Sequence, residues 1–133
     1  MHSEDTEHNV ELVRRGFQAF SARDMATLTE LFHPDARWRT APLGVIGGEH
    51  SGRDAVFAMF ANLGAQTKNT FTVTPTTYAG FADTVFVRAT AGARRGERQA
   101  QWDEVLVFRL DGGKVREVSL FLRDYPTVAE FWQ

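Results

Sequence analysis

Two ionisable side chains of this 133-residue chain occupy positions from which they could transfer protons. His50 follows a glycine-containing loop and precedes an expected helix, and a histidine can act as a general acid or base because its ordinary pKa lies near neutrality. Asp103 lies between Trp102 and Glu104 on an expected strand. A carboxylate there would have a raised pKa if it faced an apolar interior. Alternatives stay open for both residues: His50 could bond to backbone groups, and Asp103 could face solvent or pair with Arg88.

Other kinds of catalytic site are not indicated. The chain has no cysteine, which excludes disulfides, thiolate catalysis and cysteine-type zinc sites. Its four histidines show no metal-ligand spacing such as His-x-x-x-His, and the chain has no phosphate-binding loop. We therefore expect no metal and no cofactor.

Charge and hydropathy also limit the possible partners. A net charge of −2 gives no electrostatic reason to expect nucleic acid or an anionic membrane. The one basic cluster, residues 94–98, is typical of a solvated hairpin tip. No apolar run reaches the roughly 20 residues that span a bilayer, and the N-terminus has no apolar signal region. We expect a cytoplasmic protein.

The elements that would position these residues centre on a long hairpin over residues 101–124. Its turn is Asp111-Gly112-Gly113, and Asp-Gly between apolar runs is a strong hairpin signal. Val105 and its neighbour Leu106 are both apolar although they point to opposite faces. A strand that is apolar on both faces needs cover on both faces. We expect helices on one face, and a second subunit or the chain's own ends on the other.

Apolar residues recur at helical spacing in three earlier segments, which begin near Thr6, Asp24 and Ser51. Pro34 ends the second of these helices, and Gly64 suits the end of the third.

Short strands are expected at residues 35–40, 69–77 and 84–91, before the hairpin. The order predicts one α+β domain over residues 1–133. Its three N-terminal helices would pack in the concave face of a curved, mainly antiparallel sheet. Residues 128–132 form an apolar tail, which we expect to dock on the sheet or across a pocket mouth.

Three segments carry a family resemblance: Leu-Phe-His-Pro-Asp-Ala at 31–36, residues 48–56 before the third helix, and the turn at 111–115. In order and spacing they resemble the SnoaL-like or nuclear transport factor 2-like superfamily, which includes the ketosteroid isomerases. The resemblance covers nearly the whole chain. It implies a cystatin-like cone with an apolar cavity at its open end, and a homodimer through the outer face of the sheet.

The family's acidic positions are only partly matched. The general base of ketosteroid isomerases would fall at residues 40–42, which contain no carboxylate, and a second family acid falls near Val105 or Leu106. In SnoaL-type cyclases an acid closes the last strand, and this chain has Arg123 there with Asp124 next to it. Arg123 could offer a cation to a carboxylate or enolate, or Asp124 could act as a base. The alternative is an exposed pair at the strand end, since a one-residue offset reverses the face.

The fold hosts isomerases, cyclases, epoxide hydrolases, dehydratases, binding modules and adapters, so it does not fix one function. We expect a small apolar molecule, polyketide- or terpenoid-like, to bind in a cone-shaped pocket. Cofactor-independent isomerase, cyclase or hydrolase chemistry would use His50, Asp103, Arg123 and Asp124. A non-catalytic dimeric binding module and a protein–protein adapter are the alternatives. The aromatic candidates for the pocket wall, which could equally be core residues, are Trp38, Phe57, Phe86, Trp102, Phe121 and Tyr125.

Overall fold

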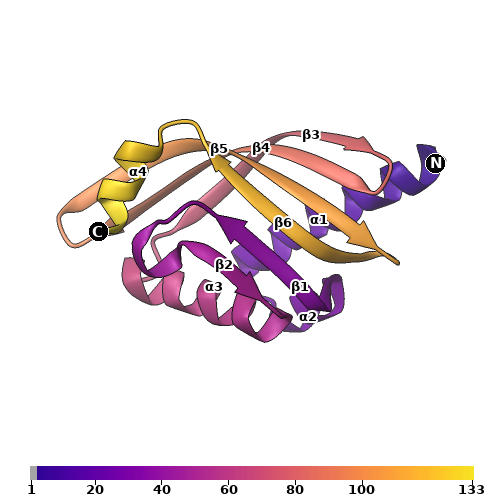
Figure 1. Ribbon diagram of the computed structural model, residues 1–133, viewed down its shortest axis with the longest axis horizontal. Coiled ribbons are helices and arrows are strands. Elements are labelled where there is room, and N and C mark those ends of the chain that lie inside the picture. The colour runs from indigo at the N-terminus through magenta and orange to yellow at the C-terminus, as the bar shows by residue number, and fades with distance from the viewer. Residues whose placement is uncertain (1–2) are drawn as a thin grey trace.

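The computed structural model of the chain describes residues 3–133 (Figure 1). Its strands are β1 (Phe32–Thr40), β2 (Gly48–Ser51), β3 (Thr72–Phe81), β4 (Thr84–Arg95), β5 (Arg98–Asp111) and β6 (Lys114–Leu122). Its helices are α1 (Ser3–Ala22), α2 (Met25–Leu31), α3 (Arg53–Thr67) and α4 (Tyr125–Trp132), with a 3₁₀ turn, η1, at Gly44–Ile46.

All six strands join one curved, mixed sheet in the order β2-β1-β6-β5-β4-β3. Only the β1–β6 pair within it is parallel, and the other four pairs are antiparallel. The predicted α+β class is therefore confirmed. The sequence predicts a glycine-containing loop before His50, and within this region the structure adds the short strand β2 from Gly48, paired with the end of β1.

The central strand β5 divides its side chains between the two faces of the sheet. Burial alternates strictly along it, and the buried side chains are those of Trp102, Glu104, Leu106, Phe108 and Leu110. Cross-strand pairs fix this register, because Glu104 is opposite Leu122 and Leu106 is opposite Leu120 on β6. Since successive side chains point to opposite faces, the odd-numbered residues Asp103 and Val105 lie on the outer face.

Helices cover the inner face of the sheet. Helix α1 packs against β3 and β4, while α3 packs against β1 and β2. Phe17 of α1 meets Phe108 of β5 edge to face, with ring centroids 5.6 Å apart. Gly80 allows α1 to lie close to β3, because a Cβ at this position would be only 2.6 Å from the Cγ2 atom of Thr6 on α1. No helix in the described part of the chain is long and apolar enough to cross a membrane.

The apolar tail forms helix α4, which lies beside the β4–β5 turn (Figure 1). The Arg95 guanidinium donates to the carbonyl oxygens of Phe131 and Gln133, both at 2.9 Å. Arg98 donates to the carbonyl of Gln133 at 2.8 Å and to that of Glu130 at 3.3 Å. Residues 94–98 form the predicted hairpin tip between β4 and β5, and all of them except Arg95 are exposed; the sequence did not show that Arg95 and Arg98 also bond to α4. These two arginines satisfy the last carbonyls of α4, where a cation is also favoured by the helix dipole.

Candidate active site

A cavity of about 90 Å³ lies between the inner face of the sheet and the helices. Helices α1, α2 and α3 each contribute two or more apolar side chains, and α4 contributes Trp132. Strands β1, β3, β5 and β6 supply the opposite wall, and Leu43 and Ile46 of the loop after β1 close one side. The lining is almost wholly apolar, so a polar group in it stands out.

Among the described residues that line the cavity, Glu104 is the one with an ionisable side chain. It is 4% exposed, and its Oε1 atom accepts a 2.8 Å hydrogen bond from the Trp102 indole N–H. Burial raises the pKa of the Glu104 carboxyl to about 7, although the Trp102 hydrogen bond acts in the opposite direction. Near neutral pH both protonation states are therefore populated, as a group that exchanges protons with a substrate requires.

Two further polar atoms are buried in residues that line the cavity. They are the hydroxyl oxygen of Thr40, the last residue of β1, and the indole nitrogen of Trp132 on α4. Neither atom has a hydrogen-bond partner in the structure. Buried polar groups in folded proteins are nearly always hydrogen-bonded, so both atoms call for an explanation.

Comparison with known proteins agrees with this architecture. The family model of the SnoaL-like domain matches residues 13–118. The chain belongs to this family. It is 36% identical to Bal32a from a soil-derived mobile gene cassette, with a TM-score of 0.93 over 96% of this chain and 98% of that one.

Two other relatives span similar lengths. Uncharacterized protein Rv0034 of Mycobacterium tuberculosis is 30% identical over 93% of this SnoaL-like chain and 95% of its own. TerC, in a crystal structure with polyporic acid, is 20% identical over 93% and 97% of the two chains, with a TM-score of 0.82. At that identity the likeness to TerC concerns the fold alone.

Of the residues predicted to be catalytic in this SnoaL-like domain, His50 lies on β2. It is half-buried, and its Nε2 atom is 3.3 Å from the carbonyl oxygen of Ile46. This contact matches the backbone-bonded alternative. His50 is not among the described residues that line the cavity.

Asp103 lies on the outer face of β5, on the side opposite the cavity. Its Oδ2 atom is 3.4 Å from an Arg123 guanidinium nitrogen, and its Oδ1 atom accepts a 3.3 Å hydrogen bond from the Thr90 hydroxyl. Of the two orientations left open for Asp103, the structure has the outward one, and the paired arginine is Arg123 rather than Arg88. The Arg123 side chain itself is 79% exposed.

Asp124 begins helix α4. Its carboxylate accepts hydrogen bonds from the Thr127 backbone N–H and from the Thr127 hydroxyl, at 3.4 and 2.8 Å. Asp124 therefore caps the N-terminus of α4, and this structural role explains an acidic residue here without a catalytic function. Arg123 and Asp124 both lie outside the cavity lining that the structure describes, and a catalytic role for either stays a prediction.

Of the six aromatic residues predicted to line the pocket, the structure places two in the cavity lining and four outside it. Trp38 and Trp102 line the cavity. The other four are absent from the described lining. Phe57 packs in the core against Phe32, with ring centroids 5.7 Å apart. The rest lie at the surface, where Phe86 and Phe121 are 44% and 59% exposed on the outer face of the sheet and Tyr125 is 39% exposed.

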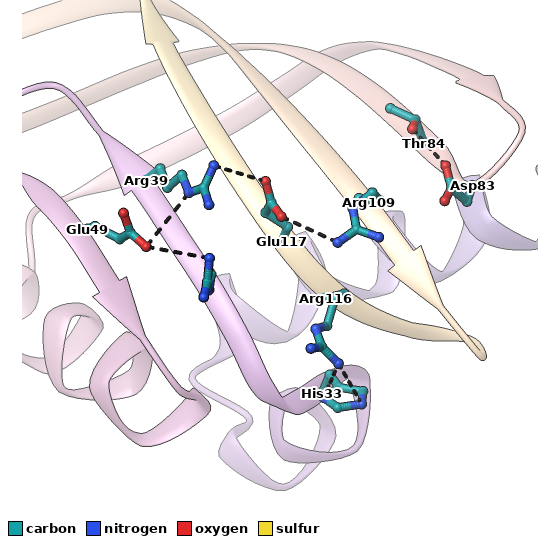
Figure 2. A network of polar contacts seen from close by, with 9 residues as sticks. His33, Arg39, Glu49, Asp83, Thr84, Arg109, Arg116 and Glu117 are labelled. Atoms are coloured by element: carbon teal, nitrogen blue, oxygen red, sulfur yellow. Dashed lines mark hydrogen bonds and ion pairs between the residues drawn. The ribbon is translucent and has the colours of Figure 1, made fainter.

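Most of the remaining charged pairs lie on the outer face as well. Glu117 of β6 forms ion pairs with Arg39 and Arg109, each at 3.4 Å, and Arg39 also approaches Glu49 at 3.9 Å (Figure 2). These pairs are solvent-exposed and contribute little to stability. Within residues 3–133, no cluster of three or more potential ligands could hold a metal ion.

Sequence reasoning missed Glu104, although a signal for it was available. Trp102, Leu106 and Phe108 are apolar residues at even-numbered positions of this strand, and Glu104 shares their even numbering. The period of two therefore places Glu104 inside and Asp103 outside. The second family acid was also expected nearby, at Val105 or Leu106, so the offset was a single residue.

Proposed function

We propose that this SnoaL-like protein binds a small, mostly apolar molecule, polyketide- or terpenoid-like, in its cavity and transfers a proton on it through Glu104. The observation that supports the proposal is a single carboxyl group, almost fully buried in an apolar cavity, whose pKa is raised to about 7. That TerC was co-crystallised with polyporic acid supports a ligand-holding use of the fold here.

The chemistry would be a cofactor-independent isomerisation or cyclisation. The Glu104 carboxylate takes a proton from a carbon next to a carbonyl group, and the electron pair of the C–H bond moves onto the carbonyl oxygen to form an enolate. In an isomerisation the new carboxylic acid then returns the proton to a different carbon. In a cyclisation the enolate carbon attacks a second carbonyl within the molecule, and the carboxylic acid gives its proton to the alkoxide that forms. Glu104 ends the cycle in its starting form. Apolar walls favour this step because they exclude water from the reacting carbon.

Proton exchange in heavy water tests the proposal. Cyclohexanone is a suitable probe, because the hydrogens beside its carbonyl exchange for deuterium when a base removes them, and NMR follows their loss. We expect the protein to accelerate the exchange, and Glu104→Gln to reduce the acceleration by about 100-fold or more, the usual size of general-base catalysis. Glutamine keeps an oxygen for the Trp102 indole, so binding should survive.

Asp103→Asn is the matched control, since it makes the same chemical change one residue away on the outer face. It should keep the full exchange rate. If Glu104→Gln exchanges as fast as the unmodified protein, the proton-transfer role is refuted.

A non-catalytic ligand-binding module is the second candidate. It is favoured by the lack of a second acid–base group among the described residues of the cavity lining. Cyclohexanone that binds but exchanges no faster than in buffer would support this candidate over the enzyme.

We also propose that the protein forms a homodimer through the outer face of the sheet. Exposed apolar side chains gather there: Phe121 lies opposite Val105 across the β5–β6 pair, and Phe86 lies on the neighbouring strand β4. Sedimentation of the unmodified protein should give the mass of two chains, and Phe121→Glu should give the mass of one. An unmodified protein that sediments as a single chain at high concentration would refute the dimer.

A further inference from the structure

The two unpartnered polar atoms of the cavity wall carry more information about the ligand than its apolar surface does. Trp132 is 1% exposed, and its indole nitrogen can only donate a hydrogen bond. The Thr40 hydroxyl can donate or accept one. Leaving such atoms buried without partners costs free energy, so a fold that keeps them is expected to use them.

Both atoms lie toward the same end of the cavity as Glu104. The Trp132 ring packs against the Trp102 ring, with centroids 6.4 Å apart, and the Trp102 indole is bonded to Glu104. Strands β1 and β6 run parallel with Arg39 opposite Ser119, so Thr40, the next residue, lies level with the later part of β6.

Leu122 is the last residue of β6 and lies directly opposite Glu104 on β5. The later part of β6, level with Thr40, is therefore also the part nearest Glu104. The other end of the cavity, near Val115 and Phe108, is lined by apolar side chains alone. The cavity is therefore polar at the α4 end and apolar at the end where β1 begins.

This division restricts the charge and the shape of a ligand. No arginine or lysine is among the described residues of the lining, so a buried anionic group would have no cation beside it. A neutral oxygen atom can instead accept from the indole N–H and the threonine hydroxyl. The volume of about 90 Å³ is below the roughly 150 Å³ of an engineered cavity that accepts benzene, so the part of the ligand inside the cavity is no larger than one ring.

We infer that Trp132 and Thr40 select the ligand by its carbonyl oxygen, and that the ligand is a neutral ring compound with a carbonyl group at one end. The ring fills the apolar end, and the carbonyl accepts hydrogen bonds from the indole N–H and the hydroxyl at the α4 end. This inference rests on the proposed function, because it assumes that the cavity holds a ligand. It adds two residues that set which ligand is held and how it is oriented relative to Glu104.

A pair of probes with the same shape tests the inference. Cyclohexanone and methylenecyclohexane differ only in carrying an oxygen or a CH₂ group on the ring. Titrations followed by NMR give the affinity for cyclohexanone relative to that for methylenecyclohexane; because this relative preference also includes the cost of removing water from the ketone oxygen, the result that tests the inference is its change between variants. Thr40→Val and Trp132→Phe should each lower that preference at least several-fold while they keep binding to methylenecyclohexane.

Using the ratio of the two affinities removes the effect of altered cavity size, because both probes experience the same change. Thr40→Ser retains the hydroxyl and is the matched control, which should keep the preference for cyclohexanone. If both Thr40→Val and Trp132→Phe retain the ratio of the unmodified protein, the inference is overturned and the proposed function stands. If the unmodified protein binds neither probe, the proposed function fails and the inference fails with it.

Discussion

The raised pKa of Glu104 makes a prediction about stability that needs no knowledge of the ligand. In the unfolded chain this carboxyl has an ordinary pKa of 4.5, and in the folded protein burial raises the pKa to about 7. Between these two values the folded state holds a proton that the unfolded state has lost. The free energy of unfolding therefore falls as the pH rises from 4.5 to about 7. Below and above this interval the contribution of Glu104 does not change with pH.

The size of the effect follows from the difference between the two pKa values. At about 1.4 kcal/mol per pKa unit, the interval corresponds to roughly 3 kcal/mol of stability present below pH 4.5 and lost above pH 7. This is a large share of the 5–15 kcal/mol by which domains are usually stable. Glu104→Gln cannot ionise, so the variant should lack this pH-dependent loss.

Urea unfolding at half-unit steps from pH 4.5 to 8.5 measures the effect on both proteins. Other titrating groups contribute equally to the two proteins, so the difference between their free energies of unfolding isolates Glu104. We expect that difference to change by about 3 kcal/mol in favour of the glutamine variant as the pH rises. Two parallel curves would show that the carboxyl is not held in an apolar environment, and the argument for its chemistry would fail.

Three other predictions concern residues outside the cavity. Arg95→Ala should cost about 1–2 kcal/mol, because two helix-end carbonyls lose a charged donor; faster amide hydrogen exchange in α4 than in β5 would show it, and unchanged protection of α4 would contradict it. His50→Gln should leave cyclohexanone exchange unchanged, since the ring lies outside the cavity lining; a lost rate would return His50 to the mechanism. Gly80→Ala should destabilise the protein by roughly 1–3 kcal/mol through a clash with Thr6; a melting temperature at or above that of the unmodified protein would exclude the close packing of α1 on β3.

Periodicity and turn chemistry were enough to predict the scaffold. The hairpin at residues 101–124 was correct because Asp111-Gly112-Gly113 forms a turn between β5 and β6, with positive φ at both glycines. The family resemblance, based on short segments in a fixed order, was confirmed by the family model over residues 13–118. These features are local, or are set by the sequential order of elements, so the sequence contains them directly.

The candidate site was harder to predict because it depends on which face of each strand is buried. Asp103 and Glu104 are chemically alike and adjacent. Which of the two carboxyls is buried depends only on whether the odd-numbered or the even-numbered side chains of β5 point inward. The contributions of Thr40 and Trp132 depend on the parallel pairing of β1 with β6 and on the docking of α4. Both are contacts between distant parts of the chain, which no local pattern specifies.

The β1–β6 pair has a consequence for the order in which the molecule assembles. Phe32 is opposite Val115, so an early strand finds its neighbour only when nearly all of the chain is present. Contacts at such separation are slow to form, because a long loop must close first. During synthesis the apolar sides of the first helices and of β1 would stay exposed to solvent until the ribosome has completed β6. We expect this interval to be when the nascent protein most depends on chaperones.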